Sequence, residues 1–319
     1  MKLRVALLTD LRQPVGPALR SPAAALAFDL AEGLAEIAAD TRELAVDLVA
    51  RRGSWNGLPL VAVEPARLGL RGGRQAGAAQ EALYVQLVLQ GMLGEYDVVH
   101  CLAPVVAPLQ LLAAQGVPVV QTLTVPPTHP AALLPGLLIE PRLLARTAPV
   151  AREEAREIPP GVDVTRFRPH DSPAGDFLLW LGSGARSEAE AVARAAGLPL
   201  RTAGPGADGL LRHAHALLHL ERRPAPAGPL WPLRALACGT PVAGWAGAGL
   251  ERLLDEPALG VLAPAGDPAG LAAALRALPD RREATAARRE RILGLYGRRA
   301  MVARYREVYR DLATRPAAT

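Results

Sequence analysis

The sequence predicts an α/β protein built from two doubly wound parallel sheets. Short apolar runs alternate with Ala- and Leu-rich stretches of helical spacing, and strands that are apolar throughout are typical of a parallel sheet covered on both faces. A proline-rich stretch at 125–160 interrupts this alternation, which restarts after residue 170. We therefore expect two Rossmann-like domains that face each other across a cleft, with ligand bound at the carboxyl ends of the strands.

The first half of the chain contains five apolar runs that we interpret as buried strands. They are "LRVALLTD" (3–10), "AVDLVA" (45–50), "LPLVAVE" (58–64), "DVVHCLA" (97–103) and "VPVVQTLT" (117–124). Residues 22–38 and 78–94 carry helical spacing and are predicted to be helices between these strands.

The second half repeats the pattern after residue 170. Strands are predicted at 176–182, 198–204, 215–220, 241–245 and 260–264. Ser187 and Glu190 form a capping box for a helix that Gly197 can close, and Asp267 with Pro268 begins a helix over 267–280. The tail at 281–313 is predicted to be one long basic helix.

Composition favours a water-soluble protein with an anionic partner. The chain has 319 residues, a net charge of +5 and a single lysine, Lys2, so that arginine carries nearly all the positive charge. No basic run is interleaved with aromatic residues, which argues against a nucleic-acid binder. The start "MKLRVALLTD" is too short an apolar run for a signal peptide, and no apolar run approaches twenty residues. Cys101 and Cys238 are expected to be buried free thiols in a reducing cytoplasm.

The segment "IPPGVDVTRFRP" (158–169) lies at the junction between the two halves. Pro159 and Pro160 cannot continue a helix, and Gly161 can adopt backbone angles that other residues avoid. A rigid turn that closes a strand and a hinge between two domains both fit this composition. The segment resembles the "I-P-N-G-V-D-x-x-x-F-x-P" motif at the domain junction of family 4 retaining glycosyltransferases, with Pro160 where asparagine is usual.

A second segment carries the same resemblance. "RALACGTPVAGWAGAGLERLLDEPALGVLAPAGDPAGLAAAL" (234–275) is similar to the family's "E-A-M-A-x-G-T-P-V… G-G-x-x-E… G-x-L-V-x-x-G-D-x-x-x-L-A", in order and in spacing. The resemblance implies a compact GT-B fold, with 1–165 as the acceptor-side domain and 166–299 as the nucleotide-sugar domain. The second domain is shortened between Gly182 and Pro226, and the last helix, about 300–315, is expected to pack back on the first domain. A membrane or anionic acceptor is the alternative partner for that basic helix.

The donor site is expected in the second domain. Gly247, Gly249 and Leu250 would form a loop and first helical turn whose free N–H groups hold a nucleotide-sugar diphosphate. Gly182-Ser183-Gly184 is a second candidate phosphate loop, with a plain tight turn as the alternative. The full set of candidate donor-binding residues is Gly182, Ser183, Gly184, Arg186, Glu221, Leu230, Arg234, Gly247, Gly249 and Leu250.

Two donor-side positions depart from the family motif. The family's paired glutamates contact the donor sugar and the ribose, and the matching positions here are Pro226 and Arg234. An arginine supplies only hydrogen-bond donors, so Arg234 could pair with a phosphate or an acidic sugar, or could be a solvated or salt-bridged helix residue. Glu221 could replace a lost glutamate, or could be a surface turn residue beside Arg222 and Arg223.

The candidate catalytic residues are His100, His129 and Arg186. His100 ends a predicted strand and could orient an acceptor hydroxyl or the leaving phosphate, or could be a buried, hydrogen-bonded histidine. His129 could replace the histidine that the family usually carries at the position of Thr124. The acceptor-side candidates are Gly16, Arg20, Ser21 and Thr124.

No metal site or hydrolase triad is expected. His213, His215 and His219 form an H-x-H-x3-H pattern, but a strand would hold them too far apart for zinc, and no carboxylate or cysteine lies nearby. The G-x-S-x-G pattern of a hydrolase nucleophile is missing from the sequence.

These observations predict a hexosyltransferase-type glycosyltransferase that acts with retention of configuration, without a cofactor or a structural metal. Its partners would be a nucleotide diphosphate-sugar and an acceptor. Catalysis would depend mainly on positioning and on stabilising the departing diphosphate. The alternative is a non-catalytic GT-B-like protein that binds a nucleotide, a glycan or a partner enzyme.

Overall fold

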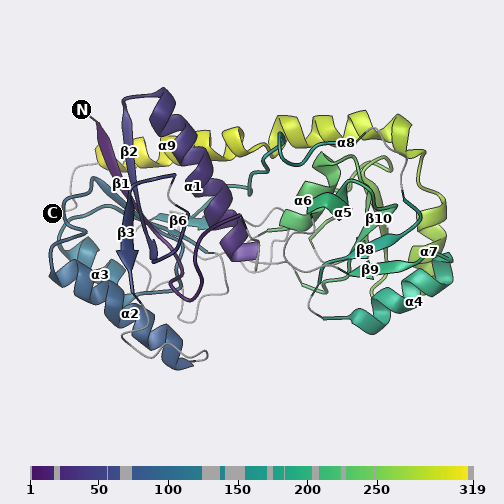
Figure 1. The fold of residues 1–319 in the computed structure, drawn as a ribbon, viewed down its shortest axis with the longest axis horizontal. Helices are drawn as coiled ribbons and strands as arrows, with labels where there is room; N and C mark the ends of the chain where they lie inside the picture. The colour runs from purple at the N-terminus through teal and green to yellow at the C-terminus, as the bar shows by residue number, and fades with distance from the viewer. Residues whose placement is uncertain are drawn as a thin grey trace. The chain divides into compact units, whose positions relative to one another are not determined.

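A computed structural model describes residues 2–17, 22–55, 57–64, 74–123, 137–140, 155–170, 175–182, 184–202, 208–223, 228–247 and 249–314. The chain forms two compact units (Figure 1). Unit 1 comprises Met1–Pro141, Thr147–Ile158 and Met301–Thr319, and unit 2 comprises Arg142–Arg146 and Pro159–Ala300.

Unit 1 is built on a seven-stranded parallel sheet in the order β3-β2-β1-β4-β5-β6-β7. Its strands are β1 (Leu3–Leu8), β2 (Leu44–Arg51), β3 (Leu60–Val63), β4 (Val98–Cys101), β5 (Val119–Thr122), β6 (Leu137–Glu140) and β7 (Ala155–Glu157). Its helices are α1 (Pro22–Asp40), α2 (Arg74–Leu89), α3 (Ala107–Ala114) and α9 (Arg298–Thr314). β6 and β7 were not predicted; both lie within the proline-rich stretch at 125–160 that interrupts the sequence pattern.

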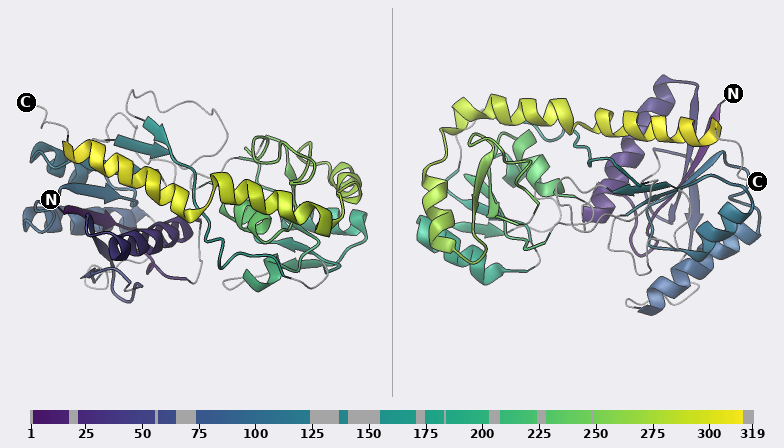
Figure 2. Two further views of the ribbon diagram at one scale, coloured as in Figure 1. Left: turned by 90° about the horizontal axis from the view of Figure 1, so that it is seen from above. Right: turned by 180° about the vertical axis from the view of Figure 1, so that it is seen from behind.

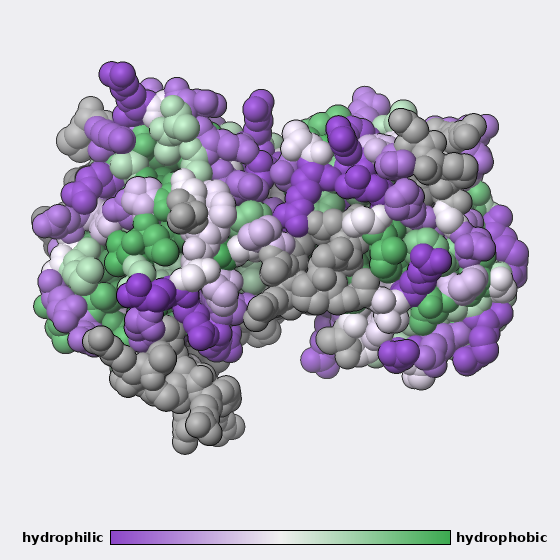
Figure 3. Space-filling model, viewed as in Figure 1, coloured by the Kyte–Doolittle hydropathy of each residue, from purple (hydrophilic) through white to green (hydrophobic). Residues whose placement is uncertain are grey.

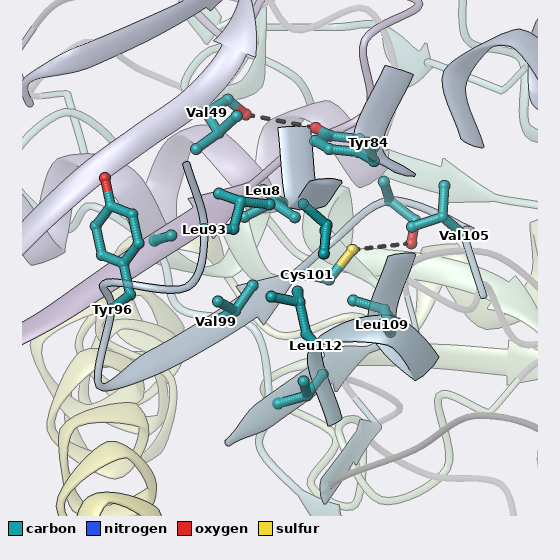
Figure 4. Packing of buried hydrophobic residues seen from close by; sticks show 14 of the residues in the cluster. Leu8, Val49, Tyr84, Leu93, Tyr96, Val99, Cys101, Val105, Leu109 and Leu112 are labelled. Atoms are coloured by element: carbon teal, nitrogen blue, oxygen red, sulfur yellow. Dashed lines mark hydrogen bonds between the residues drawn. The ribbon is translucent and has the colours of Figure 1, made fainter. Parts of the chain in front are cut away.

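The two faces of this sheet carry different side chains because residues alternate along each strand. On one face, Leu8, Val99 and Cys101 pack with Tyr84 of α2 and Leu109 of α3 in an apolar core (Figure 4). On the other face, α9 lies over β4 and β5, as the views of Figure 2 also show.

Unit 2 is built on a five-stranded parallel sheet in the order β12-β11-β10-β8-β9. Its strands are β8 (Leu178–Trp180), β9 (Leu200–Thr202), β10 (Ala216–His219), β11 (Val242–Trp245) and β12 (Gly260–Ala263). Its helices are α4 (Arg186–Ala196), α5 (Asp208–Leu211), α6 (Leu230–Ala237), α7 (Pro268–Arg276) and α8 (Arg281–Leu295). The two parallel sheets confirm the predicted fold class.

Helices α4 and α7 lie side by side and share an apolar core with the sheet (Figure 1). Ala189 and Val192 of α4 and Leu271 and Leu275 of α7 contribute to this core. Asp267 caps α7 by accepting a hydrogen bond from the Gly270 N–H at 2.8 Å, as predicted. α6 packs against α8.

The predicted single helix over 281–313 is wrong: the chain forms two helices, α8 and α9, separated by Tyr296 and Gly297. Gly297 pairs with Val162 in a parallel β-bridge, and the Val162 N–H donates to the Tyr296 carbonyl at 2.8 Å. The Arg298 N–H donates to the Val162 carbonyl at 2.9 Å. This pairing engages backbone groups that a continuous helix would use internally, which explains the break.

Asp163, in the "IPPGVDVTRFRP" segment, fixes the turn that follows it. Its carboxylate accepts from the Thr165 N–H at 2.8 Å and from the Thr165 hydroxyl at 2.6 Å, and lies 3.3 Å from the Arg298 guanidinium. Burial alone would raise the pKa of Asp163, but these hydrogen bonds and the Arg298 charge outweigh it and lower the pKa. The segment therefore has a rigid, hydrogen-bonded geometry.

The face of the molecule drawn in Figure 3 is mainly polar. In the face drawn in Figure 3, hydrophilic side chains alternate with small apolar patches. Among the described helices, none is both long enough and apolar enough to cross a membrane.

Candidate functional site

The carboxyl ends of the parallel strands in unit 2 meet at one edge of the sheet. β8 pairs with β10, and β10 pairs with β11, all in parallel register. The residues that follow these strands are therefore neighbours in space, although they lie far apart in the sequence. This edge is where a doubly wound sheet binds ligands.

The N-terminus of α4 lies at this edge and has no side-chain cap. The helix begins at Arg186, and the preceding residue, Ala185, adopts a left-handed conformation with φ 55° and ψ 27°. The predicted capping box at Ser187 is therefore wrong, because Ser187 lies inside the first turn and makes no capping hydrogen bond. Without a side-chain cap, the first-turn N–H groups can bind an anion, which the helix dipole also favours.

Ala185→Gly is expected to raise the free energy of unfolding of unit 2 by about 0.5–1 kcal/mol. A left-handed conformation strains alanine but not glycine, and Ala185 is the one non-glycine residue with positive φ among the described residues. Urea unfolding followed by tryptophan fluorescence measures the change. Ala191→Gly, within α4, is the matched control and should lower stability by about 1 kcal/mol. If Ala185→Gly and Ala191→Gly lower the free energy of unfolding equally, the backbone at Ala185 is not strained.

Trp180, the last residue of β8, brings an indole N–H to the loop before α4. Its side chain is 7% exposed, and Nε1 lies 2.8 Å from the position that a Cβ atom on Gly182 would occupy. Only glycine fits at residue 182 without displacing the indole. The Trp180 indole N–H therefore borders the loop at Gly182.

Glu188, in the first turn of α4, accepts hydrogen bonds from two residues that lie at or after the ends of other strands. One carboxylate oxygen accepts from Trp245 Nε1 at 2.9 Å, and the other accepts from Arg222 Nη2 at 2.8 Å. Trp245 ends β11 and Arg222 follows β10. The hydrogen bond from Arg222 is the main cause that lowers the pKa of Glu188, so the carboxylate is ionised. These three residues converge because β8, β10 and β11 are neighbours in the parallel sheet.

In unit 1, a small pocket follows the carboxyl end of β1. It is lined by Thr9, Asp10, Gln13, Pro14, Val15 and residues of α1. Asp10 forms an ion pair with Arg12, whose Nε donates to the Asp10 carboxylate at 2.8 Å. This hydrogen bond raises the pKa of the Arg12 guanidinium. Gly16 directly follows Val15, which lines this pocket. The other acceptor-side candidates, Arg20, Ser21 and Thr124, lie outside the described residues, as does His129.

His100 is enclosed in a polar network under α9. The side chain is fully buried, with Nδ1 2.6 Å from the Tyr309 hydroxyl and Nε2 2.7 Å from the Thr122 hydroxyl. Thr122 lies 3.0 Å from the Tyr305 hydroxyl. Burial lowers the pKa of His100 to about 3. Both ring nitrogens of His100 are within hydrogen-bond distance of protein hydroxyls. Of the two interpretations of His100, the structure therefore has the buried, hydrogen-bonded histidine and not a side chain open to an acceptor.

Solved structures match nearly the whole chain, whereas neither a family model nor a curated protein matches the sequence. AviGT4, a glycosyltransferase involved in avilamycin A biosynthesis, is 22% identical with a TM-score of 0.67, covering 98% of this chain and 99% of that one. HepE from Anabaena, solved with UDP, is 15% identical with a TM-score of 0.68, covering 98% and 100%. Sucrose-phosphate synthase from Thermosynechococcus elongatus is 19% identical with a TM-score of 0.70, covering 98% and 99%.

The chain has the GT-B fold. This result confirms the fold that the junction and 234–275 motifs predicted. At these identities the similarity establishes the fold alone, and any activity has to be argued from the residues.

Some donor-side candidates of this GT-B chain lie at the surface of the strand-end edge. Arg186 is paired with Glu190 at 3.0 Å, and Glu221 is exposed directly before Arg222. The Gly247 N–H donates to the Glu251 carboxylate, whereas Gly249 is buried and has φ 84°, an angle that favours glycine. The predicted first helical turn at Leu250 is wrong, because residues 251–259 form turns and no helix. Gly184 is exposed in the loop before α4, while Ser183 and Pro226 lie outside the described residues.

Other donor-side candidates are buried. Leu230 and Leu250 pack in the interior, so their side chains are not open to a ligand in this structure. Arg234 is 1% exposed, and its guanidinium lies 4.8 Å from the Phe167 ring centroid and 5.3 Å from the Trp231 ring centroid. Arg234 is therefore neither solvated nor at the surface; it is a buried cation between two aromatic rings.

The histidine pattern does not form a metal centre within the described part of the chain. No group of three or more metal-ligating side chains occurs there. The ring centroids of His213 and His170 lie 4.9 Å apart with the rings tilted by 59°, and burial lowers the pKa of His219 to about 4. The residues that sequence analysis missed are Trp180, Glu188, Arg222, Trp245 and Asp10. Each follows or ends a parallel strand, or begins the helix after one, and that position is the signal that could have identified them.

Proposed function

We propose that this protein is a glycosyltransferase that moves a sugar from a nucleotide diphosphate-sugar to an acceptor with retention of configuration. The observation that carries the proposal is the cluster of hydrogen-bond donors at the N-terminus of α4. First-turn N–H groups, Trp180 Nε1 and the Arg222 guanidinium gather at the ligand-binding edge of the unit 2 sheet. Such a set suits the phosphate oxygens of a nucleotide.

The chemistry follows from where negative charge develops. When the bond from the sugar to the diphosphate breaks, charge accumulates on the departing phosphate oxygens. A helix N-terminus that is already in place stabilises that charge without further reorganisation, and the guanidinium of Arg222 adds a positive charge beside it. These groups can neutralise a diphosphate, so we propose transfer that does not require a metal ion.

Two GT-B structures support a nucleotide-sugar as the donor. HepE, at 15% identity, has been solved both with UDP and with UDP-glucose. The junction and 234–275 motifs provide the same suggestion independently, through their resemblance to a retaining family. A hexosyltransferase that uses one of these donors is the activity that we propose.

The pocket after β1 is the proposed acceptor subsite. Asp10 presents a carboxylate there, and a carboxylate can accept hydrogen bonds from the hydroxyl groups of a sugar. The side chains of Cys101 and Cys238 are free and buried, which fits the cytoplasmic location that we propose.

A non-catalytic binding protein is the second candidate, and the burial of Arg234 favours it. At the position where the related motif carries a glutamate, the chain has a cation enclosed by Phe167 and Trp231. That position therefore offers no carboxylate to a ribose hydroxyl.

Thermal-shift and turnover assays against UDP-, GDP-, ADP- and TDP-sugars separate the two candidates. A glycosyltransferase should show a raised Tm with one nucleotide class, together with sugar transfer or slow donor hydrolysis. Binding with neither transfer nor hydrolysis would support the non-catalytic candidate. If no nucleotide raises the Tm, both proposals are wrong.

A further inference from the structure

Arg222 and Glu188 form a contact at the donor-binding edge that a bound anion would disrupt. Arg222 Nη2 lies 2.8 Å from one oxygen of Glu188, and its side chain is 55% exposed. We propose that this ion pair is a latch: donor binding transfers Arg222 from Glu188 to the diphosphate, and Glu188 competes with the diphosphate for it. This inference rests on the proposed function, because it assigns a residue to the diphosphate of that donor.

Arg222 can make this exchange at little cost. A guanidinium has five N–H donors, and Glu188 is its hydrogen-bond partner among the described residues through Nη2 alone. The planar fork suits bidentate binding of phosphate, and an exposed ion pair contributes little to stability. The Nη2 atom also lies 3.6 Å from the Cβ position of Gly266, in the loop before α7. Arg222 thus lies beside the first turn of α4 and the loop before α7.

Glu188 is held more firmly than Arg222. Its second oxygen accepts from Nε1 of Trp245, a residue that is fully buried, and its position in the first turn of α4 is favoured by the helix dipole. The carboxylate therefore stays at the N-terminus of α4 when Arg222 moves. An anion that binds there meets one negative charge already in place, so Glu188 should weaken the affinity for diphosphate.

Two substitutions should therefore change the affinity in opposite directions. Glu188→Gln keeps the shape and the Trp245 acceptor but removes the competing charge, and it should tighten binding of UDP and of inorganic pyrophosphate several-fold. Arg222→Gln should weaken binding of both by about tenfold or more, the loss expected for one charge-assisted contact. Arg223→Gln, at the adjacent exposed residue, is the matched control and should change the dissociation constant less than twofold.

Isothermal titration calorimetry with UDP and with pyrophosphate, without divalent metal, measures these constants on the full chain. Thermal unfolding of each variant establishes that it is folded. If the ion pair has only a structural role, Glu188→Gln and Arg222→Gln should both lower the Tm, and neither should tighten binding of UDP or pyrophosphate. This result would overturn the latch. Because Arg222 is exposed, Arg222→Gln remains informative even if Glu188→Gln is unstable.

The two proposals fail in different ways. If the unmodified protein binds UDP and neither Glu188→Gln nor Arg222→Gln alters the affinity, the latch is wrong and the proposed function stands. If none of the four proteins binds UDP or pyrophosphate, the proposed donor site is wrong and the latch falls with it.

Discussion

Phe167→Ala is expected to lower the free energy of unfolding of unit 2 by about 3–5 kcal/mol, the usual loss for a buried phenylalanine. The Phe167 ring is fully buried in the middle of the "IPPGVDVTRFRP" segment, and the Arg234 guanidinium lies 4.8 Å from its centroid. Removing the ring leaves a cavity and takes away one of the two aromatic faces that enclose a buried cation. Urea unfolding followed by tryptophan fluorescence measures the loss.

Phe167→Leu separates packing from the cation–π contact. Leucine fills most of the volume of the phenylalanine ring but has no aromatic face. Phe167→Leu should therefore lower the free energy of unfolding by less than Phe167→Ala does. A double-mutant cycle with Arg234→Met then gives the coupling between ring and guanidinium, expected to be about 1–2 kcal/mol for a desolvated pair. A loss below about 1 kcal/mol for Phe167→Ala would show that the segment is not part of the core of unit 2.

Most strands of this protein were predictable because their residues are mainly apolar. The run 3–10 was predicted as a strand and β1 spans Leu3–Leu8, and similar one- or two-residue differences occur at most other ends. β7 was missed because its residues, Ala-Arg-Glu, carry no apolar signal at all. β6, Leu-Leu-Ile-Glu, was missed although three of its four residues are apolar, because it lies inside the proline-rich stretch. The edge strand β9 was predicted, so position at a sheet edge does not by itself hide a strand.

The break between α8 and α9 could not be predicted locally. No proline separates the two helices, and the residues between them are Tyr296 and Gly297. What ends α8 is a backbone pairing with Val162, far away in the sequence. The same limit applies to the candidate site, where Glu188, Arg222 and Trp245 meet because β8, β10 and β11 are neighbours in the sheet. Sequence order alone does not state which strands are neighbours.

Acidification from pH 7.5 to pH 5 is expected to cost unit 1 about 2 kcal/mol of stability through His100. Burial lowers the pKa of His100 to about 3, whereas the unfolded chain takes up this proton near pH 6.5. Between these two values the unfolded state binds the proton and the native state does not, so stability falls as the pH decreases. The contribution is complete above pH 6.5 and is lost progressively toward pH 3.

The groups that surround His100 do not titrate in this window. Burial raises the pKa values of Tyr305 and Tyr309 above their usual range, and it raises the pKa of Cys101 to about 12. The lowered pKa of Asp163 confines its own effect to pH values below about 4. His219, whose pKa is lowered to about 4, adds a similar slope, but it lies in unit 2.

His100→Asn isolates the contribution of His100. Asparagine keeps a donor and an acceptor in the buried network but cannot be protonated in this range, so the variant should be less stable than the unmodified protein at pH 7.5 and lose less on acidification. Urea unfolding followed by circular dichroism at pH 7.5 and pH 5 measures both slopes. An unchanged slope in His100→Asn would mean that the imidazole of the unmodified protein has the same pKa in the native and unfolded states, as a solvent-exposed imidazole has. That result is incompatible with an imidazole whose two nitrogens are occupied by the hydroxyls of Tyr309 and Thr122 beneath α9.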